Sequence, residues 1–221
     1  MNSKLSLTKP TFIMLYGFPG SGKTYFARQL CEQLHAAHVQ GNRIRHELFE
    51  EPRFDRQENE IVSHLMNYMT EEFLNAGMSV VFDMNASRIS ERRALRDMAR
   101  KAKVHPVLVW FQIDTESAFA RVATRDRRKT DDKYASPLDR STFDSTISHM
   151  QNPAVTEDYI VISGKHTFHT QRSAVFKKLY DIGLLSTDSS KANVAMPGLV
   201  NLVPTPNMGR VDNTRRNIII R

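Results

Sequence analysis

The chain has 221 residues, of which 40% are hydrophobic, and this suits one compact domain with a sizeable core. Its formal net charge of +7 favours anionic ligands or polyanionic partners. The single cysteine, Cys31, excludes an intrachain disulfide and predicts a reducing compartment. The apolar runs are strand-sized, so we expect a cytoplasmic protein with no membrane partner.

Strands and helices are expected to alternate along the chain. The apolar run at 12–16 predicts a buried strand, and apolar residues three and four apart predict a helix over 23–38. After a mixed segment at 39–55, the pattern predicts helices over 58–76, 90–102, 115–125, 137–149 and 171–180, and strands over 78–83, 104–113 and 158–163. This alternation predicts an α/β fold: a three-layer sandwich with a parallel central sheet and helices on both faces.

The composition changes near Ser186. Residues 186–221 are rich in Ser, Asn, Pro and Met, show little periodicity, and contain five basic and two acidic residues. We therefore expect one domain over residues 1–185 and an extended basic tail over 186–221. The tail is interpreted either as a basic arm for nucleic acid or a partner, or as a disordered terminus.

The stretch YGFPGSGKTYF matches the phosphate-loop pattern G-x-x-x-x-G-K-[ST], with an apolar strand before it and a helix after it. Glycines let successive backbone N–H groups wrap around phosphate oxygens. Lys23 is then placed to reach the β- and γ-phosphates, and the Thr24 hydroxyl to ligate Mg²⁺. The expected cofactors are ATP and Mg²⁺, and no motif in the sequence selects ATP over GTP as the donor. The predicted nucleotide-binding residues are Gly17, Phe18, Pro19, Gly20, Ser21, Gly22, Lys23 and Thr24.

A second strand, VVFD, ends in Asp83. An acid at this position fits the carboxylate that helps to hold Mg²⁺ in phosphate-loop proteins, so Thr24 and Asp83 are the predicted metal residues. The alternative is that Asp83 forms a turn or caps a helix.

Three segments in this order, GFPGSGKT, FDMNASRISERR and ARVATRDRR, resemble the kinase module of phage polynucleotide 5′-kinases and the wider group of small P-loop kinases that includes zeta toxins. The similarity spans about residues 10–180. It implies a P-loop NTPase-type fold with a basic helical lid. In this family, lid arginines lie over the transferred phosphate, which corresponds here to Arg121 and Arg125. The resemblance also places Asp83 and Asn85 in the acceptor cleft.

The chain departs from that family in the segment VQGNRIRHELF. Family members have an Asp that acts as general base and, three positions later, an Arg that binds acceptor phosphate; here these positions hold Asn42 and Arg45. Asn accepts no proton at neutral pH, and general base catalysis contributes about 10²- to 10⁴-fold. Phosphoryl transfer depends more on positioning and charge, so reduced activity is expected rather than none. In a shifted register, Asp55, Glu47 or Asp83 would supply the carboxylate.

The leading hypothesis is an ATP- and Mg²⁺-dependent kinase that phosphorylates a hydroxyl, with Lys23, Asp83 and Arg125 as catalytic residues and Asn42, Arg45 and Asn85 binding the acceptor. A polynucleotide 5′ end is favoured as acceptor by the basic charge and the resemblance; a small metabolite or nucleotide sugar is the alternative. The rival hypothesis is an ATP-binding or ATPase regulatory module with little or no transfer activity.

Overall fold

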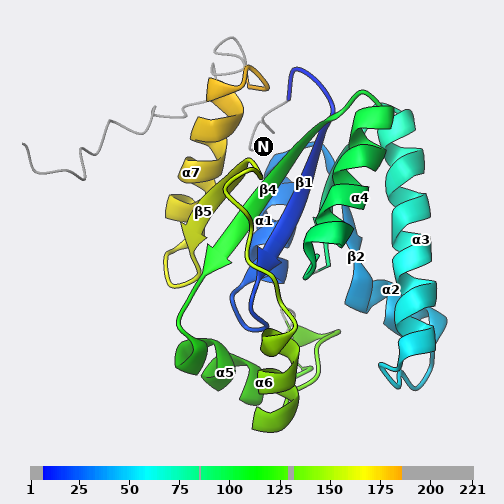
Figure 1. Cartoon of the computed structure of the whole chain (residues 1–221), viewed down its shortest axis with the longest axis vertical. Helices are drawn as coiled ribbons and strands as arrows, with labels where there is room; N and C mark the ends of the chain where they lie inside the picture. The colour runs from blue at the N-terminus through cyan, green and yellow to red at the C-terminus, as the bar shows by residue number, and fades with distance from the viewer. Residues whose placement is uncertain (1–6, 85, 129–131, 186–221) are drawn as a thin grey trace, which may run out of the picture.

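The computed structural model describes residues 7–84, 86–128 and 132–185. Five parallel strands form one sheet in the order β2-β3-β1-β4-β5 (Figure 1). The strands are β1 (Thr11–Gly17), β2 (Ala36–Gln40), β3 (Ser79–Asp83), β4 (His105–Gln112) and β5 (Tyr159–Ser163). The predicted α/β fold with a parallel central sheet is therefore confirmed. Asn85 and the predicted tail over 186–221 lie outside the described residues.

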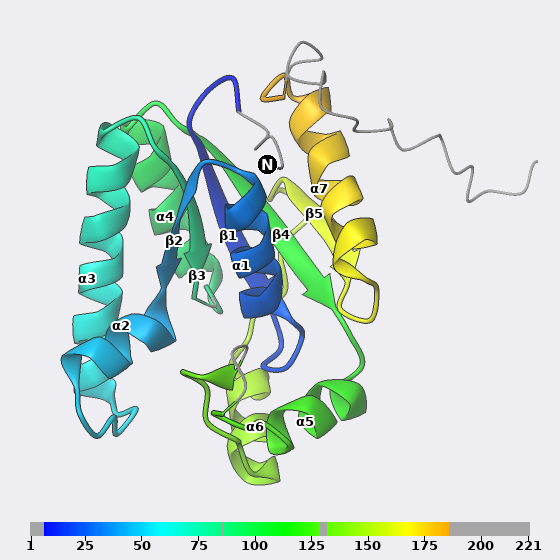
Figure 2. The ribbon, with the colours of Figure 1, turned by 180° about the vertical axis from the view of Figure 1, so that it is seen from behind.

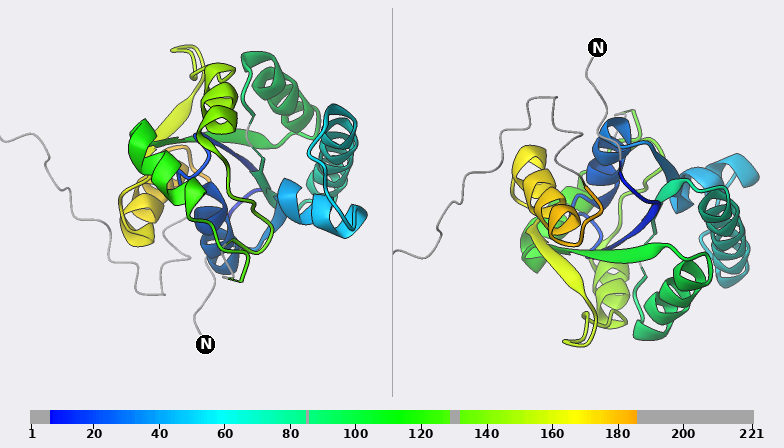
Figure 3. Two further views of the ribbon diagram at one scale, coloured as in Figure 1. Left: turned by 90° about the horizontal axis from the view of Figure 1, so that it is seen from below. Right: turned by 90° about the horizontal axis from the view of Figure 1, so that it is seen from above.

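Helices cover both faces of this sheet. α1 (Lys23–Gln33) and α7 (Phe168–Asp181) lie on one face, and α3 (Arg56–Asn75) and α4 (Ile89–Lys101) lie on the other (Figures 1 and 2). The short helices α2 (Gly41–Leu48), α5 (Thr115–Ala123) and α6 (Arg140–Ser148) lie at the edge where the strands end (Figure 3). In the described part of the chain, no helix is long and apolar enough to cross a membrane.

The central strand β1 is buried along its whole length. Ile13 and Leu15 pack into the core beneath α1 and α7. Phe12 and Met14 pack into the opposite core beneath α3 and α4. A strand covered on both faces is apolar at successive positions, which is why the sequence here shows a continuous hydrophobic run rather than an alternating one.

The prediction of a helix over 23–38 is wrong from residue 34 onward. The helix ends at Gln33, and residues 36–40 form β2 instead. Helical spacing continues into this segment, but each of these residues pairs with β3 in parallel register, from Ala36 opposite Ser79 to Gln40 opposite Asp83. Pairing with a buried strand outweighs the local preference for helix, which is weak over a few residues.

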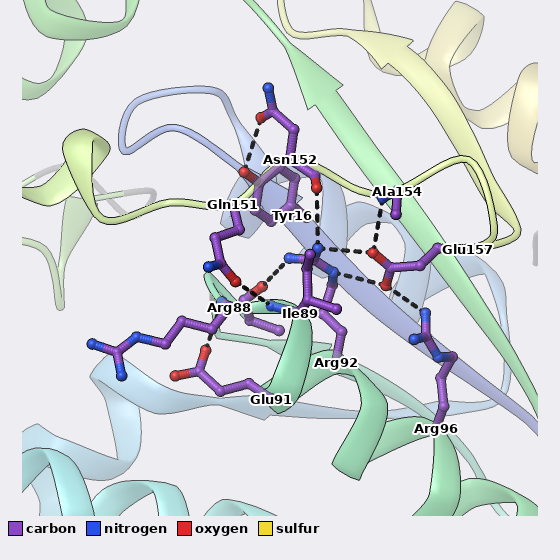
Figure 4. Close-up of polar contacts among 11 residues, drawn as sticks. Tyr16, Arg88, Ile89, Glu91, Arg92, Arg96, Gln151, Asn152, Ala154 and Glu157 are labelled. Carbon is purple, nitrogen blue, oxygen red and sulfur yellow. Dashed lines mark hydrogen bonds and ion pairs between the residues drawn. The ribbon is translucent and has the colours of Figure 1, made fainter.

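A buried charge network ties the connection between α6 and β5 to α4 (Figure 4). The Arg92 side chain is fully buried; its Nε and Nη2 donate to the Glu157 carboxylate at 3.0 and 2.9 Å, and its Nη1 donates to the carbonyl of Ala86 at 2.9 Å. Arg96 donates to the same carboxylate. Burial alone would raise the pKa of Glu157, but the hydrogen bonds from Arg92, the Ala154 N–H and Arg96 lower this pKa to about 2. The backbone that follows β3 is thereby fixed to α4.

We expect Glu157→Ala to lower the free energy of unfolding by about 3–5 kcal/mol, because Arg92 would remain buried without its carboxylate. Urea denaturation followed by circular dichroism measures the loss. Glu116→Ala is the matched control: Glu116 pairs with Arg140 at the surface, where an ion pair contributes about 1 kcal/mol or less. Similar losses in the two variants would contradict a structural role for the network.

Candidate functional site

The phosphate loop joins β1 to α1 in a conformation that requires glycine. Gly20 has a φ of +81°, and a Cβ added there would lie 2.3 Å from the carbonyl oxygen of Ala118 in α5. Gly22, with a φ of +96°, is the N-cap of α1. L-residues with side chains rarely adopt such backbone conformations, so these glycines set both the curve of the loop and its close packing against α5.

The N-terminus of α1 faces this loop. The first N–H groups of a helix have no partner within the helix, and no side chain accepts a hydrogen bond at the Gly22 cap. The first turn of α1 also contains no acidic residue. These N–H groups and the positive end of the helix dipole therefore make this point suited to an anion.

Lys23 lies inside the loop. Its Nζ donates to the carbonyl oxygens of Gly17 and Phe18 at 2.6 and 2.8 Å. Burial lowers the pKa of Lys23 to about 7, while Asp83 opposes this decrease and the positive charge of Arg125 adds to it. The Lys23 ammonium lies among loop carbonyls and near the positive charge of Arg125. An anion bound close to Lys23 and Arg125 would stabilise the charged form of Lys23.

The predicted metal residues Thr24 and Asp83 are in contact. The Thr24 hydroxyl donates to Asp83 Oδ1 at 3.2 Å, from the first turn of α1 to the end of β3. Asp83 is 7% exposed. Its other carboxylate oxygen, Oδ2, lies 3.1 Å from Nε2 of His38 in β2. Sequence reasoning missed His38, because it fell within a segment predicted to be helical.

The predicted lid corresponds to α5, α6 and the described residues between them, and its two arginines lie in different places. Arg121 Nη1 donates to the carbonyl of Gly164 at 2.8 Å and to that of Gly20 at 3.4 Å, so it links the phosphate loop to the connection between β5 and α7. Arg125 is half-buried and donates to the carbonyl of Ser136 at 3.2 Å. The positive charge of Arg125 contributes to the lowered pKa of Lys23, so both arginines affect the phosphate loop, Arg121 through the Gly20 carbonyl and Arg125 through its charge.

On the other side of the loop, α2 presents Asn42 and encloses Arg45. Asn42 is exposed in the first turn of this helix. Arg45 is only 3% exposed; its Nη1 donates to Glu58 Oε2 at 3.0 Å, and its Nη2 donates to Asn59. The guanidinium of Arg45, predicted to bind the acceptor, is therefore engaged by α3.

Glu58 holds the segment between α2 and α3. Its carboxylate accepts from the backbone N–H groups of Arg53 and Phe54, in addition to Arg45. Burial alone would raise the pKa of Glu58, but these hydrogen bonds lower it to about 2. Phe54 is thereby held at a φ of +58°, a conformation rare for an aromatic residue. Such a locally strained residue persists because its surroundings determine its position.

The remaining carboxylates considered as substitutes for a general base have other partners. Asp55 caps α3, since its Oδ1 accepts from the Glu58 N–H at 2.9 Å, and it also pairs with Arg53. Glu47 is exposed and lies 4.0 Å from Arg43. Of the three candidates, only Asp83 lies beside Thr24.

The lid meets α2 through aromatic contacts. The ring of Tyr134, in the segment between α5 and α6, lies 5.8 Å from the ring of His46 in α2. Burial lowers the pKa of His46, and the positive charge of Arg127 contributes to the decrease. The lid and α2 thus approach each other on the side of the phosphate loop where β2 and β3 end.

The model of a protein family described as an AAA domain matches residues 12–153. The chain belongs to this AAA domain family. No curated protein sequence matches the chain. Its parallel sheet and the phosphate loop between β1 and α1 give the matched region a P-loop α/β fold.

Solved structures share this AAA domain fold at low sequence identity. They include a gluconokinase from Sinorhizobium meliloti 1021, with 15% identity, coverage of 78% of this chain and 93% of that chain, and a TM-score of 0.57. Kti12 from Chaetomium thermophilum, solved in complex with ADP-AlF3, has 18% identity, coverage of 79% and 99%, and a TM-score of 0.59. The APS kinase of Mycobacterium tuberculosis in complex with AMPPNP and APS has 16% identity, coverage of 78% and 98%, and a TM-score of 0.54.

The lowered pKa of Lys23 predicts proton uptake when a nucleotide binds. At about pH 8 a lysine with a pKa of about 7 is mostly neutral, whereas a lysine beside phosphates is protonated, so binding Mg-ATP should take up close to one proton. At about pH 6 the uptake should be small because Lys23 is already charged. Calorimetric titrations in buffers of different ionisation enthalpy measure the uptake.

Lys23→Arg is the control for this measurement, because a guanidinium stays charged at both pH values. The variant should bind with little proton uptake at either pH. Equal uptake at the higher pH by the Lys23→Arg variant and by the unsubstituted protein would show that the proton goes to another group.

Proposed function

We propose that this AAA domain protein is an ATP- and Mg²⁺-dependent kinase that transfers the γ-phosphate to a hydroxyl acceptor. The observation that carries the proposal is the meeting of Lys23 and the Thr24–Asp83 pair at one phosphate loop, where Lys23 Nζ donates to two loop carbonyls and the Thr24 hydroxyl donates to Asp83. A loop alone would suffice to bind phosphate. Transfer also needs cations placed around the moving group, and Arg125 provides such a charge from the lid.

The residues at the loop fit ATP and Mg²⁺. Thr24 and Asp83 are neighbouring oxygen donors, the type of ligand that Mg²⁺ prefers in proteins. Mg²⁺, when bound, neutralises phosphate charge and so favours the displacement. Lys23 and the first N–H groups of α1 would hold the β- and γ-phosphates. Thr24 and Asp83 would hold the metal.

Arg125 is assigned to stabilising the transferred phosphate. Its guanidinium stays charged and presents a planar set of N–H donors to phosphate oxygens. Arg121 is assigned instead to holding the loop in place, because its Nη1 donates hydrogen bonds to the backbone carbonyls of Gly20 and Gly164.

The acceptor is proposed to bind between the lid, α2 and the end of β3. Asn42, exposed on α2, and Asn85, which follows β3 in the sequence, would contact it directly. Arg45 would act as a positioning residue, because its contacts with Glu58 and Asn59 fix α2 against α3. In the reaction the acceptor oxygen bonds to the γ-phosphorus, the bond from this phosphorus to the β–γ bridging oxygen breaks, and the hydroxyl proton is released to solvent or a carboxylate.

A polynucleotide 5′ end is the proposed acceptor, supported by the net charge of +7 and by the resemblance to phage polynucleotide 5′-kinases. The tail over 186–221 would then act as a basic arm beside a kinase domain over 1–185. A small metabolite hydroxyl is the alternative acceptor, since one protein of similar fold is a gluconokinase.

A nucleotide-binding regulatory module is the second candidate function. The observation that favours it is Asn42, which stands on α2 where the resembling family has a carboxylate and which accepts no proton at neutral pH. Such a module would bind ATP through the same loop without phosphorylating an acceptor.

The deciding experiment follows transfer of label from γ-labelled ATP, with Mg²⁺, to 5′-hydroxyl RNA and DNA oligonucleotides. We expect labelled product that is lost in Lys23→Ala, because this change removes the cation at the β- and γ-phosphates while preserving the loop glycines. Asn42→Asp should raise the rate, by about 10²- to 10⁴-fold if a general base is absent, or leave it unchanged. Reactions without oligonucleotide report hydrolysis.

Each outcome identifies one function. Labelled oligonucleotide that depends on Lys23 supports the kinase with a polynucleotide acceptor. Lys23-dependent labelling of small hydroxyl compounds, but not of oligonucleotides, would indicate the metabolite kinase. ATP binding without transfer to any acceptor, in both the unsubstituted protein and Asn42→Asp, would identify the regulatory module.

A further inference from the structure

We propose that His38 is a positioning residue for the metal side of the phosphate loop, acting through Asp83. This inference rests on the proposed function, because it takes Thr24 and Asp83 to be the groups that hold Mg²⁺. The reason is a continuous chain of contacts from β2 through β3 to α1. His38 Nε2 lies 3.1 Å from Asp83 Oδ2, and Thr24 Oγ1 lies 3.2 Å from Asp83 Oδ1.

The direction of each hydrogen bond in this chain follows from the groups involved. An ionised carboxylate only accepts hydrogen bonds, so His38 must carry its proton on Nε2 and donate it to Asp83. The hydroxyl of Thr24 likewise donates to Asp83. Both oxygens of Asp83 are therefore engaged, one by each neighbouring element, and the carboxylate plane is fixed.

A fixed carboxylate determines how the Thr24 oxygen is presented. Because the Thr24 proton points to Asp83, the lone pairs of its oxygen point elsewhere and can be given to a cation. Without a partner on Oδ2, Asp83 would be free to turn about its terminal bond, and the Thr24 hydroxyl would lose a defined acceptor. His38 thus controls the orientation of the hydroxyl through the carboxylate.

The surroundings favour this role over simple packing. The Asp83 side chain is 4% exposed and the His38 side chain 21% exposed, so solvent competes little for this hydrogen bond. β2 is the edge strand next to β3, and parallel pairing sets His38 opposite Val81, two residues before Asp83. Groups that orient a metal ligand typically change metal affinity by about 10- to 100-fold when they are removed.

Two substitutions of matched polarity test the inference. In His38→Gln the side-chain amide N–H₂ extends about as far as Nε2 and can still donate to Asp83. In His38→Asn the same amide is one methylene shorter and does not reach. His35→Asn is the control for the loss of a histidine, because His35 is exposed at the start of the same segment.

The measurement is binding of Mn²⁺, as a substitute for Mg²⁺, to the full-length protein with ADP, followed by electron paramagnetic resonance. We expect His38→Asn to weaken Mn²⁺ binding by about tenfold or more, and His38→Gln and His35→Asn to change it by less than about threefold. Binding of ADP without metal should be equal in all four proteins. Thermal denaturation monitors the fold of each variant.

Other results would overturn the inference. Equal Mn²⁺ affinity in His38→Asn and His38→Gln would exclude a role for the hydrogen bond, and a parallel loss of metal-free ADP binding would indicate a disturbed loop instead. Failure of the proposed kinase function is seen separately: the unsubstituted protein would bind Mn²⁺ and ADP but label no acceptor. The inference on His38 would then still stand for the binding site.

Discussion

Everything at the candidate site depends on the parallel pairing of β1 with β3 and β4. Because the three strands run in one direction, their carboxyl ends meet at one edge of the sheet, and the phosphate loop leaves β1 at that edge. Asp83 arrives there at the end of β3, and α5 with Arg121, followed by Arg125, comes after β4. Burial of β1 on both faces fixes this arrangement, since a shift in register would move every buried side chain.

The charge balance at this edge explains why it suits an anion such as phosphate. Lys23 and Arg125 act on the same small region, with Asp83 as the nearby carboxylate that opposes the decrease in the pKa of Lys23. Asp83 acts on Lys23 and Asp132 acts on Arg125, and a phosphate bound near Lys23 and Arg125 would be attracted by both cations. The N-terminus of α1 adds to the same field, so the backbone and the side chains favour the same ligand.

Two buried arginine–glutamate pairs hold the segments around the site. Arg45 with Glu58 fixes α2 and the segment before α3. Arg92 with Glu157 fixes the connection between α6 and β5 to α4, and Arg92 also holds the backbone after β3 through the Ala86 carbonyl. Buried pairs of this kind add little net stability compared with apolar residues, but removing one partner is costly. They add fixed polar contacts to irregular segments that also pack against the core through residues such as Phe49, Ala86 and Met150.

The sequence by itself determined the phosphate loop, the strand ending in Asp83 and the alternation that gives a parallel sheet. These features are local: they depend on glycine conformations, on continuous apolar runs, and on residues adjacent in the chain. Only the tertiary structure decided that residues 36–40 form a strand, that Arg45 donates a hydrogen bond to Glu58, and that His38 contacts Asp83. Each of these depends on a partner from another element, and helical spacing or residue type at one position carries no information about that partner.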